Sequence, residues 1–116
     1  MLVRNKLIIL KTRFRDPAYP DEAFYCWHCV LMEGLLASFP NMAREIDVER
    51  IAWPRPRKEL ISLIGADNQS VPVLLLANDA PKGIEAKSHN GIVFINDKDS
   101  ILHALSAIYG IPFPHP

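Results

Sequence analysis

The placement of proline limits the secondary structure of this chain more than any other feature. The sequence has ten prolines, and they fall between the segments that have a regular hydrophobic period. Proline lacks an N–H group and fixes φ, so it interrupts helix interiors and central strands. The chain is therefore divided into short elements, each of them one strand or one helix.

Between these breaks, the hydrophobic pattern predicts strands and helices in turn. Short apolar strands are predicted at residues 6–10, 45–51, 71–76 and 92–95. Amphipathic helices are predicted at residues 27–39, from Pro56 to a Gly65 cap, and from an Asn96–Asp97 N-cap to Gly110. The remaining long stretches are predicted to be loops at residues 12–25 and 77–91, with a tail at 111–116.

The order β-α-β-α-β-β-α predicts an α/β fold. A helix joins the first two strands, so these strands are expected to be parallel, with a right-handed crossover. The last two strands are separated by a loop and are expected to pair antiparallel. The sequence thus predicts one domain over residues 1–116, with a mixed four-stranded sheet and helices on both faces.

Charge and hydropathy exclude several classes of function. The chain has 13 basic and 13 acidic side chains, which disfavours a nucleic-acid binder. It has no run of roughly 20 apolar residues that could span a membrane. The early apolar run at residues 7–10 is too short for a signal peptide, so a cytoplasmic location is expected. Two cysteines are too few for a disulfide scaffold.

The sharpest chemical motif is Cys26-Trp27-His28-Cys29, at the start of the first predicted helix. A CxxC beside a βαβ pattern predicts thiol–disulfide chemistry. The positive end of a helix stabilises a thiolate, which makes Cys26 the expected nucleophile. Cys29 lies one helical turn further on and is the expected resolving cysteine. A protonated His28 would favour the thiolate further, so it joins the predicted catalytic set.

The same cysteines are compatible with two other functions. One is metal carriage, either as a zinc site or as an iron–sulfur cluster shared between two chains, in which each chain supplies two thiolates. The other is a binding module without catalysis, which would keep the fold and use Trp27, Trp53 and the long loop to dock a partner. No resident metal or cofactor is predicted, because only Cys26, Cys29 and His28 lie near each other in the sequence, fewer than the four ligands of a usual zinc site.

The motif and the element order together resemble the thioredoxin superfamily. Val71-Pro72, before the third predicted strand, resembles the cis-proline segment that faces the cysteines in those proteins. Residues 25–39, 52–56 and 94–99 resemble a family of short bacterial thioredoxin-like proteins to which no function is assigned. Trp27-His28 replaces the Gly-Pro of thioredoxins and the Pro-Tyr of glutaredoxins.

The resemblance also implies substrate contacts. The backbone of Val71, next to Pro72, would hold an extended substrate. Residues 94–105 resemble the end of the glutathione-binding domain of glutathione transferases, in which Asp97 matches an acid that holds the glutathione amino group. The implied partners are a disulfide-containing protein or a small thiol such as glutathione, which would also be a co-ligand for a cluster.

Three further features allow two interpretations each. Trp27 either forms a substrate lid or docking surface, or packs beneath residues 12–25. The basic run of Arg55, Arg57 and Lys58 either binds an anion or is a solvated face. Trp53, between prolines, belongs either to the core or to an interface.

Overall fold

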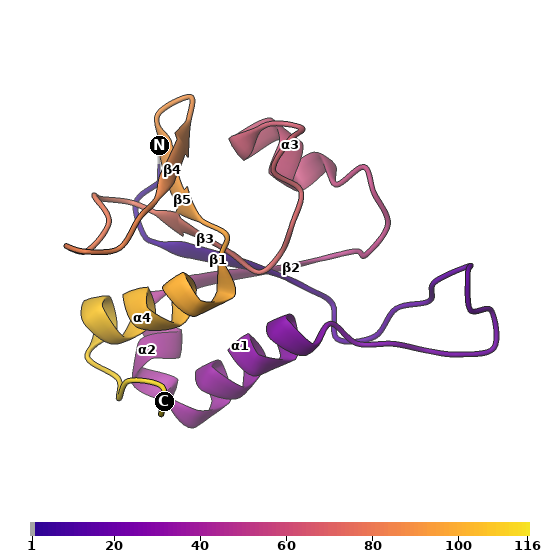
Figure 1. Ribbon diagram of the computed structural model, residues 1–116, viewed down its shortest axis with the longest axis horizontal. Coiled ribbons are helices and arrows are strands. Elements are labelled where there is room, and N and C mark those ends of the chain that lie inside the picture. The colour runs from indigo at the N-terminus through magenta and orange to yellow at the C-terminus, as the bar shows by residue number, and fades with distance from the viewer. Residues whose placement is uncertain (1) are drawn as a thin grey trace.

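A mixed sheet of five strands forms the centre of the computed structural model, which describes residues 2–116 (Figure 1). The strands lie side by side in the order β2-β1-β3-β5-β4. β1 and β2 are parallel, as predicted, and the other neighbouring pairs are antiparallel. The strands are β1 Lys6–Leu10, β2 Asp47–Ile51, β3 Val73–Leu76, β4 Lys87–His89 and β5 Ile92–Ile95.

Helices cover both faces of the sheet, as the sequence predicts (Figure 1). α1, α2 and α4 lie on one face, and α3 packs on the other against β4 and β5. None of the helices in residues 2–116 combines the length and apolarity that a bilayer crossing requires. The helices are α1 Trp27–Ser38, α2 Pro40–Glu45, α3 Lys58–Ile64 and α4 Lys98–Tyr109.

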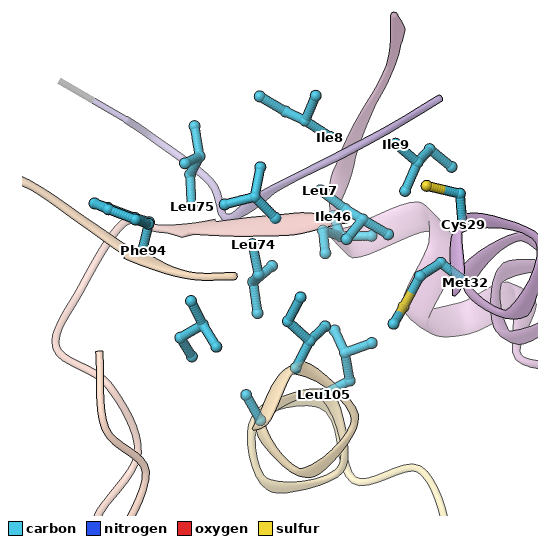
Figure 2. Packing of buried hydrophobic residues seen from close by; sticks show 14 of the residues in the cluster. Leu7, Ile8, Ile9, Cys29, Met32, Ile46, Leu74, Leu75, Phe94 and Leu105 are labelled. Atoms are coloured by element: carbon cyan, nitrogen blue, oxygen red, sulfur yellow. The ribbon is translucent and has the colours of Figure 1, made fainter. Parts of the chain in front are cut away.

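The central strands are apolar because helices cover them on both sides. All of β3 is buried, and Leu7 of β1 lies opposite Leu74 in the antiparallel register. Leu74 points toward Leu105 of α4, whereas Leu75 points to the opposite face (Figure 2). Successive side chains therefore pack on different helices. Each fully buried leucine contributes about 2 kcal/mol relative to exposure.

The prediction of a four-stranded sheet is wrong, because a fifth strand, β4, lies within the predicted loop 77–91. β4 pairs with β5 through the two-residue turn Asn90-Gly91, where φ is 48° and 81°. Asn-Gly with both φ values positive is the preferred chemistry of a tight hairpin. β4 is short and exposed, so its sequence carries no hydrophobic alternation, but the Asn-Gly pair was a usable signal.

The predicted helix boundaries need two corrections. Pro40 ends α1 as predicted, but it also begins α2, because a proline is tolerated at the first helical position. Pro56 does not begin a helix, since α3 begins at Lys58 and Arg57 is its N-cap. The segment before α3 is not helical, and the Trp53 carbonyl in it accepts hydrogen bonds from the Arg57 guanidinium.

Residues 12–25 form a loop, as predicted, and this loop projects from the domain as an arm (Figure 1). Two backbone hydrogen bonds close its base, from Phe14 N to Phe24 O at 3.0 Å and from Phe24 N to Phe14 O at 2.9 Å. The Phe14 ring stacks on Trp53, with centroids 5.3 Å apart and planes 4° from parallel. The aromatic stack fixes the base of the arm against the segment that leads to α3.

Candidate dithiol site

Cys26 caps the N-terminus of α1, where the sequence predicts it. Its backbone is extended, with φ −81° and ψ 114°, and its Sγ accepts a hydrogen bond from Cys29 N at 3.3 Å. The side chain is partly exposed. The sulfur therefore lies at the positive end of a helix of 12 residues and is still accessible to a reactant.

Cys29 lies one turn further along α1 and is buried, at 2% exposure. Its Sγ accepts a hydrogen bond from the Leu10 amide at 3.4 Å, and Figure 2 shows it at the edge of the core near Ile9. Burial raises the pKa of Cys29 to about 12, and the Cys26 sulfur also raises it, against the lowering effects of the Leu10 amide and Arg57. Cys29 is therefore a protonated thiol at neutral pH.

A hollow of about 210 Å³ lies beside Cys26. Val71 also lines this hollow, so Val71 and Cys26 share one site. The Val71–Pro72 peptide bond is cis. Pro72 itself is buried next to β3. The walls of the hollow come from β1, the arm, the segment before α3 and the segment before β3; they are Leu10, Phe14, Cys26, Trp53, Arg55, Arg57, Ser70 and Val71.

Arg57 forms a cationic wall of this hollow. Its side chain is only 7% exposed, and backbone carbonyls hold it in place. Nε and Nη2 donate to Trp53 O at 3.0 and 2.7 Å, and Nη1 donates to Gln69 O at 2.7 Å. Burial and the nearby charge of Arg55 lower the pKa of Arg57, while the two cysteines raise it. The arginine therefore supplies a positive field at the dithiol.

Trp27 and His28 lie on the solvent side of the motif. Trp27 is 71% exposed, so the interpretation that it packs beneath the arm is wrong. Its ring lies against the half-buried His28 ring, with centroids 4.1 Å apart. Neither residue lines the hollow beside Cys26. Both are placed to contact a partner that approaches the motif from outside.

Asp97 lies apart from the hollow. Its carboxylate caps α4, accepting hydrogen bonds from Ser100 N at 3.0 Å and Ser100 Oγ at 2.8 Å. These hydrogen bonds lower the pKa of Asp97. Asp97 lines a different cavity, of about 260 Å³, that shares no lining residue with the hollow beside Cys26. The expected N-cap is confirmed, and the structure does not bring this carboxylate together with the dithiol.

The predicted site did not include the four aromatic or charged residues that line the hollow, which are Phe14, Trp53, Arg55 and Arg57. Phe14 lay in a predicted loop, and Trp53 had no assigned place. Arg57 belonged to a basic run, but nothing in the sequence separates the buried arginine from its exposed neighbours Arg55 and Lys58. Only the fold shows which of these side chains turns inward.

These features define an α/β domain with a dithiol at the N-terminus of its first helix and a cation beside it. The chain belongs to the family described as "Protein of unknown function (DUF3088)", whose profile matches residues 4–113. No curated protein and no solved structure gives a significant match. Within residues 2–116, no group of three or more His, Cys, Asp or Glu side chains could hold a metal ion.

Proposed function

We propose that this protein exchanges thiols and disulfides through Cys26 and Cys29 on a thioredoxin-like fold. The observation that carries the proposal is the contrast between the two sulfurs. Cys26 is partly exposed at a helix N-terminus and lines an open hollow, whereas Cys29 is buried one turn away. An accessible nucleophile followed by a sheltered resolving thiol is the arrangement that disulfide exchange requires.

The reaction has two displacement steps. The Cys26 thiolate attacks one sulfur of a substrate disulfide, forms a mixed disulfide, and releases the other half as a thiolate. Cys29 then loses its proton to the departing group and attacks the Cys26 sulfur, which releases the second half as a thiol. The product is a Cys26–Cys29 disulfide, and an external dithiol reductant returns both cysteines to the reduced state.

The raised pKa of Cys29 supports this order of events. A thiol whose pKa is about 12 is not the attacking group at neutral pH, because the thiolate is the nucleophile. Cys29 becomes reactive once a mixed disulfide has formed on Cys26, because the half that it displaces takes up its proton on leaving. Burial therefore keeps Cys29 from reacting directly with external disulfides.

The arrangement of the sheet supports the thioredoxin-like assignment. β2, β1, β3 and β5 form the mixed four-stranded arrangement that the resemblance implies, and β4 adds one strand at the edge. The CxxC motif begins the helix that follows β1, and Val71 lies across the hollow from it. In this proposal, the Val71 backbone holds the substrate, and the partner is a disulfide-containing protein or a small disulfide.

A second candidate function is docking without catalysis, and the exposed aromatic residues favour it. Tyr25 and Trp27 flank Cys26 and are 63% and 71% exposed. Large exposed aromatic side chains are enriched at sites where partners bind. In the exchange mechanism, these residues would contact a protein substrate; in the alternative, they would be the whole interaction surface.

The first test is a redox titration of the purified protein in glutathione buffers of defined potential, with the Cys26–Cys29 disulfide read by mass. We expect complete and reversible conversion at one potential. The Cys29→Ser variant is the matched control and should stop at a mixed disulfide with one glutathione on Cys26. Absence of an intramolecular disulfide at every potential would remove the dithiol mechanism and leave docking or metal carriage. Metal analysis of freshly purified protein separates those two.

A further inference from the structure

Arg57 is a buried cation without a carboxylate partner in the part of the chain that the structure describes. Its side chain is 7% exposed, and the ion pairs among residues 2–116 do not include it. The carbonyls of Trp53 and Gln69 hold the guanidinium but do not neutralise it. Burying a charge is unfavourable when no counterion is near it. An anion that enters the hollow would offset this cost.

The Arg57 guanidinium also keeps two N–H groups that no described residue accepts. Of the five N–H bonds that an arginine side chain carries, three donate to backbone carbonyls, one each from Nε, Nη1 and Nη2. One N–H on each terminal nitrogen has no acceptor among the described residues. Two N–H groups on neighbouring nitrogens match the two oxygens of a carboxylate.

A second arginine increases the positive charge of the same hollow. Arg55 lines it together with Arg57, and its charge is close enough to lower the pKa of Arg57. Arg55 is exposed and takes part in no ion pair of the described chain. Two cations held near each other repel, and an anion between them would relieve that repulsion.

The size of the hollow and its apolar residues restrict the part of the ligand that is attached to the anionic group. About 210 Å³ is less than the roughly 300 Å³ at the lower end of cavities for drug-sized ligands. The stacked rings of Phe14 and Trp53, with Leu10, form an apolar wall. The hollow therefore fits a short aliphatic group that ends in an anion, with Cys26 at its rim.

We propose that the substrate of Cys26 is a small disulfide that carries a carboxylate a few bonds from its sulfur. The inference rests on the proposed exchange function and names its substrate class. The carboxylate binds Arg55 and Arg57, and the aliphatic part packs on Phe14 and Trp53. The Cys26 thiolate then attacks the adjacent sulfur, and the distant half leaves as a thiolate. Cys29 next displaces the bound half as a thiol and closes the Cys26–Cys29 disulfide.

The test compares three small disulfides that differ mainly in charge: 3,3′-dithiodipropionate, bis(2-hydroxyethyl) disulfide and cystamine. The rate of each disulfide with the reduced protein is divided by its rate with dithiothreitol in the same buffer. This normalised rate corrects for the different intrinsic reactivities of the three disulfides toward thiols. We expect the anionic disulfide to have a normalised rate about ten times that of the neutral one, with the cationic one slowest. Raising the salt concentration from about 0.05 M to about 0.5 M should reduce this preference.

Arg55→Gln is the informative variant, because Arg55 is exposed and its replacement does not open the core. It should reduce the preference for the anionic disulfide, measured as the ratio of the anionic to the neutral normalised rate, by about threefold or more. Lys58→Gln removes an equal charge from an exposed residue outside the hollow and should keep the preference within about twofold.

The outcomes separate this inference from the proposed function. Equal normalised rates for the three disulfides would overturn the carboxylate site and leave thiol–disulfide exchange intact, with the arginines serving only the thiolate. An equal effect of Arg55→Gln and Lys58→Gln would overturn a local site in favour of overall charge. Failure of all three disulfides to react would overturn both the exchange function and its substrate class.

Discussion

The N-termini of α1 and α4 have the same local geometry and different chemistry. Each helix has 12 residues and begins with an extended N-cap whose side chain accepts a hydrogen bond from the amide three residues later. In α1 the acceptor is the Cys26 sulfur, at 3.3 Å, and in α4 it is the Asp97 carboxylate, at 3.0 Å. The difference between the two regions lies in what surrounds each cap.

The α4 cap is saturated by its own helix. Ser100 gives Asp97 both an amide and a hydroxyl hydrogen bond, and a carboxylate is among the best N-caps. The α1 cap uses a thiol, which is a weak acceptor, and lies beside a hollow with an arginine that no carboxylate pairs among residues 2–116. A helix cap with few local hydrogen-bond partners is therefore free for chemistry, whereas a fully hydrogen-bonded cap stabilises its helix.

The sharpest way to separate capping from chemistry at α1 is Cys26→Ser. Serine is a good N-cap, so the free energy of unfolding in urea should stay the same or rise by about 0.5 kcal/mol. Disulfide exchange should fall by about a hundredfold or more, because a hydroxyl does not replace the thiolate nucleophile. A variant that keeps its exchange rate, or that loses stability, would mean that the Cys26 sulfur has a structural role instead.

The buried side of the same motif should make stability depend on alkaline pH. Cys29 ionises near pH 9.0 as an unperturbed thiol and near 12 in the folded protein. Between these values the folded state holds the extra proton, so the unfolding free energy falls as pH rises through this window. We expect a loss on the order of a few kcal/mol.

This dependence is measured by urea unfolding at several pH values under reducing conditions. Cys29→Ser is the comparison variant. Its hydroxyl can accept the hydrogen bond from the Leu10 amide, but it does not ionise in this pH range. The variant should lose less stability than the wild type over the same pH interval. If the unfolding free energies of the two proteins changed with pH in parallel, burial would not raise the pKa of Cys29.

The smallest effect is expected at the α4 cap. Asp97→Ala should lower the unfolding free energy by about 1 kcal/mol, because the Ser100 amide loses its acceptor. Exchange of a neutral disulfide should not change, since Asp97 lies outside the hollow beside Cys26. Asp97→Asn retains a capping oxygen and should recover most of the stability. If Asp97→Asn recovered its stability but exchanged disulfides much more slowly, Asp97 would have to be counted among the substrate-binding residues.

Much of the fold follows from periodicity, and its departures have identifiable causes. β1, β3, β5 and the three longer helices are apolar segments between proline or glycine breaks, so local pattern and final structure agree. β4 was not predicted, because a short, exposed edge strand needs no alternation of apolar and polar residues. The conformation of the segment before α3 was not predicted, because the Trp53 carbonyl there accepts hydrogen bonds from the buried Arg57 side chain. No local sequence pattern encodes this contact.

The sequence alone determined the position of the dithiol, the caps of both long helices and the α/β class, because spacing and residue type set local backbone structure. Only the tertiary structure decided how deeply Cys29 is buried, and that Arg57, rather than Arg55 or Lys58, is buried beside the dithiol. It also separated Asp97 from the hollow and brought Phe14, Trp53 and Val71 into it. Burial and charge proximity depend on segments far apart in the chain, so they arise only when the sheet brings those segments together.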